Sequence, residues 1–394
     1  MPAFEIRNPE MPKRKRREAS YRVHSALAFA RAAIILWSGL ILGDGSRSQP
    51  AENSPGLSPA LGWHEIPNTR IETYCPQEPS IQGVGGCRSV IDAWNGGVAD
   101  LKRERLIIWG GGHTDYYGNE VYALDLRSLS MSRLTEPSPV TNVNDCPEAY
   151  PDGRPSSRHT YGGLTYDPIQ DAMFTFGGSK SSCGAMSTAI WKLGFPNLQW
   201  SSMEPHRGEK LYYAPGITSE FDPNTGVTYV SDRQSLFRYN SSTDTLTQLV
   251  ALPTVDYHLT AVIDAERKLF LMMGGAGQLW SIEIGPHSKH AVQDWSKQVK
   301  GCDKLLHFTS PGLAYDPQRH LVVGWGGGNS VVEFDTAKMS CTEESFPGGP
   351  GTSQKGGTWG RFRYFPSLGV FVIVNDWKQN AYYLRLSSPD TKRR

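Results

Sequence analysis

The sequence predicts an all-β protein, a β-propeller of six blades that is closed by a strand from its N-terminal side. Three observations support this prediction: a turn that recurs every 42 to 55 residues, an apolar run after each turn, and an N-terminal segment that resembles the outer strands elsewhere. The 394 residues include Gly 41 and Pro 27, which favours many turns over long helices.

The recurring turn ends an extended run and usually consists of an aromatic residue, Asp and Pro. Its copies are Tyr166-Asp167-Pro168, Phe221-Asp222-Pro223, Ile263-Asp264-Ala265, Tyr315-Asp316-Pro317 and Tyr364-Phe365-Pro366, with a degenerate copy at Ala99-Asp100-Leu101. Repeats of about 50 residues, each with room for four strands, are typical of propeller blades.

A continuous apolar run follows each turn. The six runs are Leu106–Trp109, Met173–Phe176, Val227–Val230, Leu269–Met272, Leu321–Trp325 and Val370–Val374. Such runs predict strands packed on both faces, as between stacked blades.

The last repeat ends after its third strand, at Leu386. Trp63-His64-Glu65-Ile66 resembles outer strands such as Leu198-Gln199-Trp200, so we expect it to pair with Ala381–Leu386 and close the ring. This gives four predicted segments: a signal peptide or signal anchor (1–47), a linker (48–62), the propeller (63–387) and a tail (388–394).

Glycines end most of the apolar runs. They are Gly110-Gly111-Gly112, Gly177-Gly178, Gly274-Gly275 and Gly326-Gly327-Gly328, whereas Ser231-Asp232 and Asn375-Asp376 stand in the third and last repeats. With these glycines the chain resembles the Kelch/galactose-oxidase propeller superfamily over residues 63–387. The resemblance implies a fold and leaves the function open.

The N-terminus indicates export. Residues 1–47 carry a net charge of +5, with Lys13–Arg17 before an apolar run at 32–43, as in a secretory signal. An uncleaved anchor that holds the protein to a membrane through 32–43 is the main alternative, and a nuclear-type basic tract is a weaker one. We therefore expect a secreted, periplasmic or cell-envelope protein.

All six cysteines follow this segment, and an even number of cysteines in an exported chain predicts disulfides. The favoured pairs are Cys75–Cys87 and Cys146–Cys183, with Cys302–Cys341 as a weaker choice. The sequence shows no Cys/His spacing typical of a metal site and predicts no cofactor.

Residues 48–394 carry a net charge of −4, which argues against a nucleic-acid partner. We expect a monomer whose partner is an acidic polysaccharide or another glycan.

Candidate site residues lie where inner strands begin and where second strands end, because both positions open on the same face around the axis. At the starts of inner strands stand Arg158, His159, Tyr212, Tyr213, Tyr257, His258, His307, Arg361 and Arg363. At the ends of second strands stand His113, Lys180, Arg233, Asn329 and Trp377.

This mixture of His, Tyr and Arg resembles the site of propeller-fold polysaccharide lyases. Eliminative cleavage of a uronate needs a cation for the carboxylate, a base for the neighbouring carbon acid and an acid for the leaving oxygen. The resemblance implies His113, His159, Tyr213 and Arg233 as catalytic residues. Lys180 stands where such lyases can place a second His. By their positions at the mouth, the expected substrate-binding residues are Lys180, His258, His307, Asn329, Arg361 and Trp377.

Structural roles compete with these functional ones. The loop at His113 and Asp115 could be only a turn, Tyr213 and Tyr257 could be packing residues, and Arg233 could pair with Asp232. His258 and His307 could simply cap strands. A non-catalytic glycan- or protein-binding propeller and a sugar epimerase or isomerase remain the alternative functions.

Overall fold

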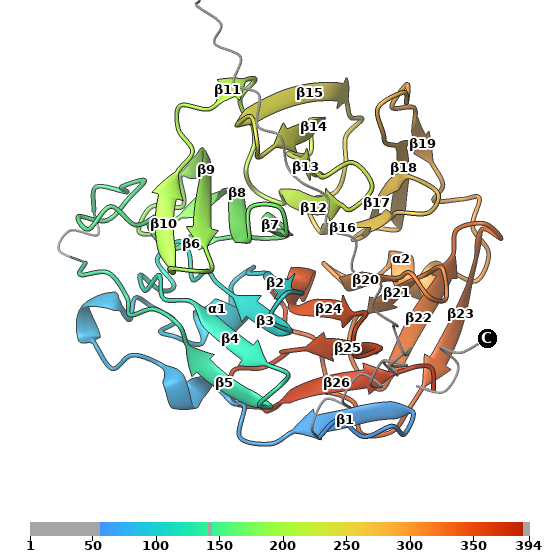
Figure 1. The fold of residues 1–394 in the computed structure, drawn as a ribbon, viewed down its shortest axis with the longest axis horizontal. Helices are drawn as coiled ribbons and strands as arrows, with labels where there is room; N and C mark the ends of the chain where they lie inside the picture. Colours follow the sequence, from blue (N-terminus) through green and yellow to red (C-terminus); the bar gives the residue numbers. More distant parts are fainter. Residues whose placement is uncertain (1–55, 141–143, 389–394) are drawn as a thin grey trace, which may run out of the picture. The chain divides into compact units, whose positions relative to one another are not determined.

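The computed structural model describes residues 56–140 and 144–388. These residues form six small, mainly antiparallel sheets arranged as the blades of a six-bladed β-propeller (Figure 1). The predicted signal or anchor segment 1–47, its apolar run 32–43 and the tail residues 389–394 lie outside the described residues. No helix in the described ranges is long and apolar enough to cross a membrane.

The first three blades follow each other along the chain. Blade I contains β2 (Gly97–Asp100), β3 (Arg105–Ile108), β4 (Tyr122–Asp125) and β5 (Ser130–Arg133). Blade II contains β6 (Arg158–His159), β7 (Leu164–Asp167), β8 (Ala172–Lys180), β9 (Met186–Gly194) and β10 (Gln199–Ser202). Blade III contains β11 (Arg207–Gly208), β12 (Thr218–Asp222), β13 (Val227–Ser231), β14 (Ser235–Asn240) and β15 (Thr245–Ala251).

The other three blades complete the ring. Blade IV contains β16 (Leu259–Asp264), β17 (Leu269–Gly274), β18 (Gln278–Glu283) and β19 (Val292–Asp294). Blade V contains β20 (Gly312–Asp316), β21 (Leu321–Trp325), β22 (Ser330–Asp335) and β23 (Ser340–Ser345). Blade VI contains β24 (Phe362–Phe365), β25 (Val370–Ile373), β26 (Ala381–Arg385) and, from the start of the chain, β1 (Gly62–Ile66).

Short helices lie in the connections. They are η1 (Ile71–Tyr74), η2 (Pro79–Ile81) and α1 (Ser89–Asp92) between β1 and β2, α2 (Asp303–Leu306) before blade V, and η3 (Trp359–Arg361) before β24.

The recurring Asp has a local structural reason. The Asp167 carboxylate accepts hydrogen bonds from the backbone N–H groups of Ile169 and Gln170, at 2.8 and 3.1 Å. Asp316 does the same for Gln318 and Arg319. An Asp at this position therefore fixes the tight turn between an inner strand and the second strand.

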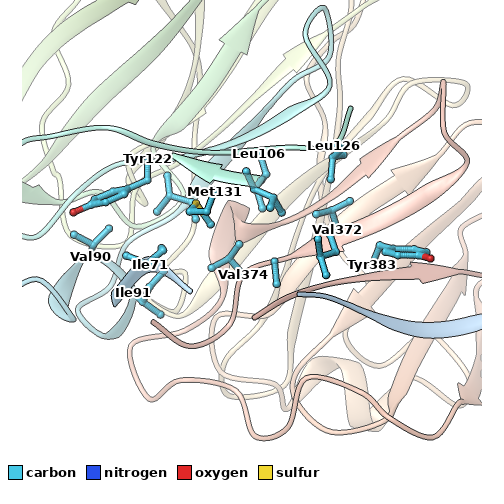
Figure 2. Close-up of a cluster of buried hydrophobic side chains, with 14 of the residues drawn as sticks. Ile71, Val90, Ile91, Leu106, Tyr122, Leu126, Met131, Val372, Val374 and Tyr383 are labelled. Carbon is cyan, nitrogen blue, oxygen red and sulfur yellow. The ribbon is translucent and has the colours of Figure 1, made fainter. Parts of the chain in front are cut away.

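The predicted ring closure is confirmed. β1 pairs with β26 in an antiparallel register that sets Trp63 opposite Leu384 and Ile66 opposite Ala381. Ile66 is buried in an apolar cluster between blades VI and I. Figure 2 shows Leu106 of blade I and Val372 of blade VI in the same cluster. The N-terminal strand thus ties the first and last blades together through apolar packing.

The six cysteines pair as Cys75–Cys87, Cys146–Cys183 and Cys302–Cys341, and no described cysteine is free. The predicted pairing is therefore confirmed. Three disulfides in one domain are typical of proteins from oxidising compartments such as the periplasm or the extracellular space.

Candidate functional site

The candidate site is the mouth of the propeller, which we define as the face where the inner strands begin and the second strands end. The registers support this definition: Thr218 at the start of β12 lies opposite Ser231 at the end of β13. Likewise, Leu259 at the start of β16 lies opposite Gly274 at the end of β17. Residues just outside these ends therefore meet on one face.

Two of the predicted catalytic residues contact each other. The imidazole rings of His113 and His159 are stacked, with centroids 4.6 Å apart. His159 is 4% exposed, and its Nε2 lies 2.9 Å from a carboxylate oxygen of Asp115. Burial and the neighbouring His159 both lower the pKa of His113, with burial the larger cause. His113 is therefore a half-buried imidazole that is mainly neutral at pH 7.

Two disulfide-bonded loops hold the His113–Asp115 turn. In the loop before Cys87, the N–H groups of Gly85 and Gly86 donate to the Asp115 carbonyl, at 2.8 and 3.0 Å. In the loop that contains Cys183, the Ser182 N–H donates to the His113 carbonyl.

Gly184 lies directly against the His113 ring, where a Cβ would come within 2.3 Å of Cε1. The two loops therefore fix both the backbone and the ring of this turn.

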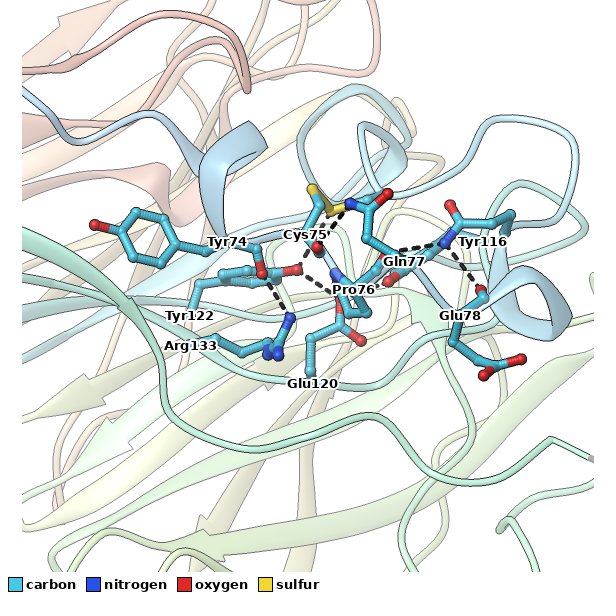
Figure 3. The surroundings of a disulfide bond; sticks show 11 residues. Tyr74, Cys75, Pro76, Gln77, Glu78, Tyr116, Glu120, Tyr122 and Arg133 are labelled. Carbon is cyan, nitrogen blue, oxygen red and sulfur yellow. Dashed lines mark hydrogen bonds between the residues drawn. A yellow bond between two sulfur atoms is a disulfide. The ribbon is translucent and has the colours of Figure 1, made fainter.

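Figure 3 shows a buried carboxylate near the first of these disulfides. Glu120 is 1% exposed, and one of its oxygens accepts hydrogen bonds from the hydroxyls of Tyr116 and Tyr122, both at 2.7 Å. Burial raises the pKa of Glu120. This network also helps to fix the His113–Asp115 turn, because Tyr116 follows Asp115 directly in the chain.

The other two predicted catalytic residues also contact each other. The Arg233 guanidinium lies 5.2 Å from the ring centroid of Tyr213 and 5.9 Å from that of Tyr257, which are cation–π distances. It donates to the Val255 carbonyl, at 3.0 Å from Nη2. The alternative partner Asp232 instead accepts from the backbone of Tyr212, Gln234 and Ser235. Within the described residues, no carboxylate forms an ion pair with Arg233.

Aromatic rings connect the two pairs. Tyr161 lies 6.1 Å from His159 and 5.9 Å from Tyr257 between ring centroids. Trp94 and Trp359 pack on this row from blades I and VI, against His159 and Tyr161 respectively. The four predicted catalytic residues therefore lie along one row of rings, in two contacting pairs.

Sequence reasoning missed Trp94, Tyr161 and Trp359. Each has a positive φ of about 50°, a backbone conformation that is rare for aromatic residues and is held by surrounding packing. A usable signal exists in the sequence: each precedes a glycine by one or two residues shortly before an inner strand. The missed partner Asp115 carries no comparable signal.

A cavity of about 330 Å³ opens beside the Arg233 pair. Its lining residues are Tyr213, Arg233, Gln234, Leu252, Pro253, Thr254 and Val255. This volume is at the lower end of the range for small-molecule sites.

The predicted substrate-binding residues differ in their distance from the row of aromatic rings at the mouth. At the end of β8, the Lys180 Nζ lies 3.6 Å from the Glu148 Oε2. The ring of His258 packs on the ring of Tyr257, with centroids 4.2 Å apart. His307 is exposed after α2, with Nδ1 2.7 Å from the Asp303 carbonyl.

Asn329 accepts a hydrogen bond from the Gly349 backbone, and Trp377 packs against the core between blades VI and I. Of these residues, only His258 contacts the row of aromatic rings directly, through Tyr257.

Arg361 requires a correction. It is fully buried, and its guanidinium donates to backbone carbonyls of Asn95, Val374, Asn375 and Gly357. Burial lowers the pKa of Arg361 to about 10. The predicted substrate-binding role is therefore replaced by a structural one, since the side chain fixes the turn before β24 and has no exposed donor.

Among the described residues, no group of three His, Cys, Asp or Glu side chains is arranged to hold a metal ion.

The fold and this face define a disulfide-bonded six-bladed β-propeller whose mouth is lined by histidine, tyrosine, tryptophan and arginine. No protein-family model matches the chain, and no curated protein matches it in sequence. A solved structure from Bacteroides thetaiotaomicron, described as a protein of unknown function, is similar with a TM-score of 0.51 and 10% identity. The alignment covers 82% of this chain and 76% of that one, and at this identity it shows the fold alone.

Proposed function

We propose that this protein is an exported, Kelch-type propeller that binds an acidic glycan at its mouth. It cleaves the glycan by β-elimination and is thus a uronate-specific polysaccharide lyase. The single observation that carries the proposal is Arg233. Its cation has no carboxylate partner in the described part of the chain, it lies against two phenol rings, and it borders an open cavity.

A uronate carboxylate is the complementary ligand for this arrangement. A guanidinium forms strong charge-assisted hydrogen bonds with a carboxylate, and a sugar ring packs well against aromatic side chains. Pairing with Arg233 would also withdraw charge from the uronate and make the hydrogen on the adjacent carbon more acidic.

The exposure and the hydrogen bonds of the two histidines indicate which of them can exchange a proton with the substrate. His159 is buried and bound to Asp115, so it serves as a positioning residue for His113. His113 is half-buried and mainly neutral at pH 7, which suits a base that removes the proton next to the carboxylate. Tyr213, beside Arg233, donates a proton to the leaving oxygen.

The reaction then balances without water. The base takes the proton from C5, the C4–O bond breaks, a C4=C5 double bond forms, and the leaving oxygen takes the proton from tyrosine. The product is an unsaturated uronate that absorbs ultraviolet light.

The test is an absorbance assay over a panel of acidic polysaccharides, with neutral glucans as controls. We expect an unsaturated product from at least one uronate polymer, and a loss of roughly 100- to 10,000-fold in rate for Tyr213→Phe and His113→Gln. Near-normal rates in both variants on an active substrate would overturn the assignment.

Glycan binding without cleavage is the second candidate, and Tyr212 favours it. Tyr212 is 51% exposed beside Tyr213 and offers a flat aromatic surface at the mouth. Saturable binding of a uronate oligosaccharide with no absorbance change across the panel would indicate this non-catalytic function.

A further inference from the structure

We infer that the propeller has a second ligand site at the opposite end of its axis, and that this site binds a small neutral phenol or aromatic alcohol. The site is a cavity on the propeller axis, on the face where each inner strand turns into the second strand. We call it the axial cavity. It does not depend on the proposed reaction at the mouth.

The axial cavity has a volume of about 290 Å³ and receives side chains from all six blades. Its wall is mainly apolar, because the recurring turns place Tyr166, Phe221 and Tyr315 there together with several prolines and small aliphatic residues. A mainly apolar cavity with a few convergent polar groups is the usual form of a small-molecule site. Aromatic walls favour an aromatic ligand, since ring pairs gain energy beyond that of the buried area alone.

The polar groups are an ion pair that crosses the axis. Arg363 on β24 of blade VI meets Glu220 on β12 of blade III, with Nη1 2.5 Å from Oε1. Both side chains line the cavity and are largely shielded from solvent, at 13% and 18% exposure. Arg363 is further fixed by the carbonyls of Gly360 and Gly97.

The two side chains neutralise each other's charge, and both keep hydrogen-bonding capacity that no protein group in the described ranges uses. Among the described residues, the Glu220 carboxylate accepts one protein hydrogen bond, through Oε1, so Oε2 remains free to accept from a ligand. Arg363 has five N–H groups, and its bonds to Glu220, Gly360 and Gly97 do not use all of them.

These two properties select the ligand. A charged ligand would have to break the ion pair or add an unpaired charge to a shielded site, which is costly. A neutral ligand leaves the pair intact. A single hydroxyl can donate to the free oxygen of Glu220 and accept from a free N–H of Arg363, while an aromatic ring fills the apolar wall.

The test measures binding of 4-methylphenol by saturation-transfer NMR and titration, against toluene and 4-methylbenzoate. We expect saturable binding of the phenol and at least 10-fold weaker binding of the other two compounds. Ala99→Phe and Ala314→Leu each place a larger side chain at the cavity wall and should weaken phenol binding at least 10-fold. The matched control is Ala276→Phe, at an exposed position outside the cavity, and it should bind like the native protein.

A variant that removes the charge of Glu220 tests separately whether the ion pair causes the preference for a neutral ligand. Glu220→Gln leaves Arg363 without its anion, so the preference should change from 4-methylphenol to 4-methylbenzoate. Lack of saturable phenol binding by the native protein, or unchanged affinity in both cavity variants with a normal melting transition, would overturn the inference. If Glu220→Gln does not fold, the two cavity variants decide the question alone.

Discussion

The imidazole of His113 lies on the imidazole of His159, with the ring planes 28° apart, while His159 reaches Asp115 on its other side. Because His159 is buried and already bound, His113 is the histidine of this pair that a ligand can reach. The stack therefore connects a part-buried Asp–His contact to a half-exposed imidazole at the mouth.

This stack makes a prediction about the pKa of His113. Burial and His159 lower that pKa, and Asp115 raises it. We expect His159→Gln to raise the pKa of His113, since the electrostatic effect of His159 that lowers this pKa is removed, and Asp115→Asn to lower it further. NMR titration of the ring protons measures both shifts. His307, which is exposed elsewhere, serves as the internal control, and shifts of equal sign in the two variants would contradict the account.

The second prediction concerns the loop that holds His113. Gly184→Ala should displace the His113 ring, because a Cβ there would come within 2.3 Å of it. Gly153→Ala is the matched control: it also has a positive φ, of 82°, but no atom lies within 4 Å of its Cβ position. Both variants carry the same kind of backbone strain. Only Gly184→Ala should shift the His113 resonances and reduce activity at the mouth, and equal effects would show that the contact is unimportant.

The third prediction concerns stability and pH. Burial raises the pKa of Glu120 above its ordinary value of 4.5, so the folded protein retains a proton that the unfolded chain releases. This proton stabilises the fold fully below the unfolded pKa, and its contribution is lost as the pH rises through the folded pKa. Glu120→Gln should therefore lose less stability than the native protein as the pH increases from about 5 to 8.

Chemical denaturation across this range, with the exposed Glu72→Gln as control, measures the slope. A slope in Glu120→Gln equal to that of the native protein would show that Glu120 does not hold the proton.

The fourth prediction concerns ring closure. Ile66 is 1% exposed and packs between the first and last blades, so Ile66→Ala should lower the free energy of unfolding by about 2–5 kcal/mol. Val84, which is 83% exposed, is the control, and Val84→Ala should change stability by less than about 0.5 kcal/mol. Equal melting temperatures for the two variants would mean that β1 does not secure the ring.

Features with a local cause were predictable from the sequence. In five of the six turns an Asp accepts hydrogen bonds from the backbone N–H groups that follow it, so it recurs at the same point of five blades and reveals their period. The β1–β26 pairing was predictable because Trp63–Ile66 has the pattern of an outer strand. Cys75–Cys87 and Cys146–Cys183 were predictable because each pair falls in loops of one neighbourhood, whereas Cys302–Cys341 was a weaker choice and Cys341 lies in strand β23.

Features that depend on geometry between blades were not predictable. Glu220 and Arg363 meet across the axis although 143 residues separate them, and nothing in either repeat marks the pair. Arg361 stands at a mouth position in sequence, but the turn before β24 directs its side chain inward to four carbonyls. Asp115 was considered only as a turn residue, since its contact with His159 joins two different blades.

The central claim is that Arg233 binds a uronate carboxylate at the mouth. The direct measurement is calorimetric titration of a uronate oligosaccharide and of the same oligosaccharide with its carboxylates converted to amides. The native protein should prefer the acid by about 10- to 100-fold, as expected for charged hydrogen bonds. Arg233→Gln should abolish this preference and Arg233→Lys should retain part of it, with both variants melting cooperatively. Equal affinity of the native protein for acid and amide, or an unchanged preference in Arg233→Gln, would contradict the account.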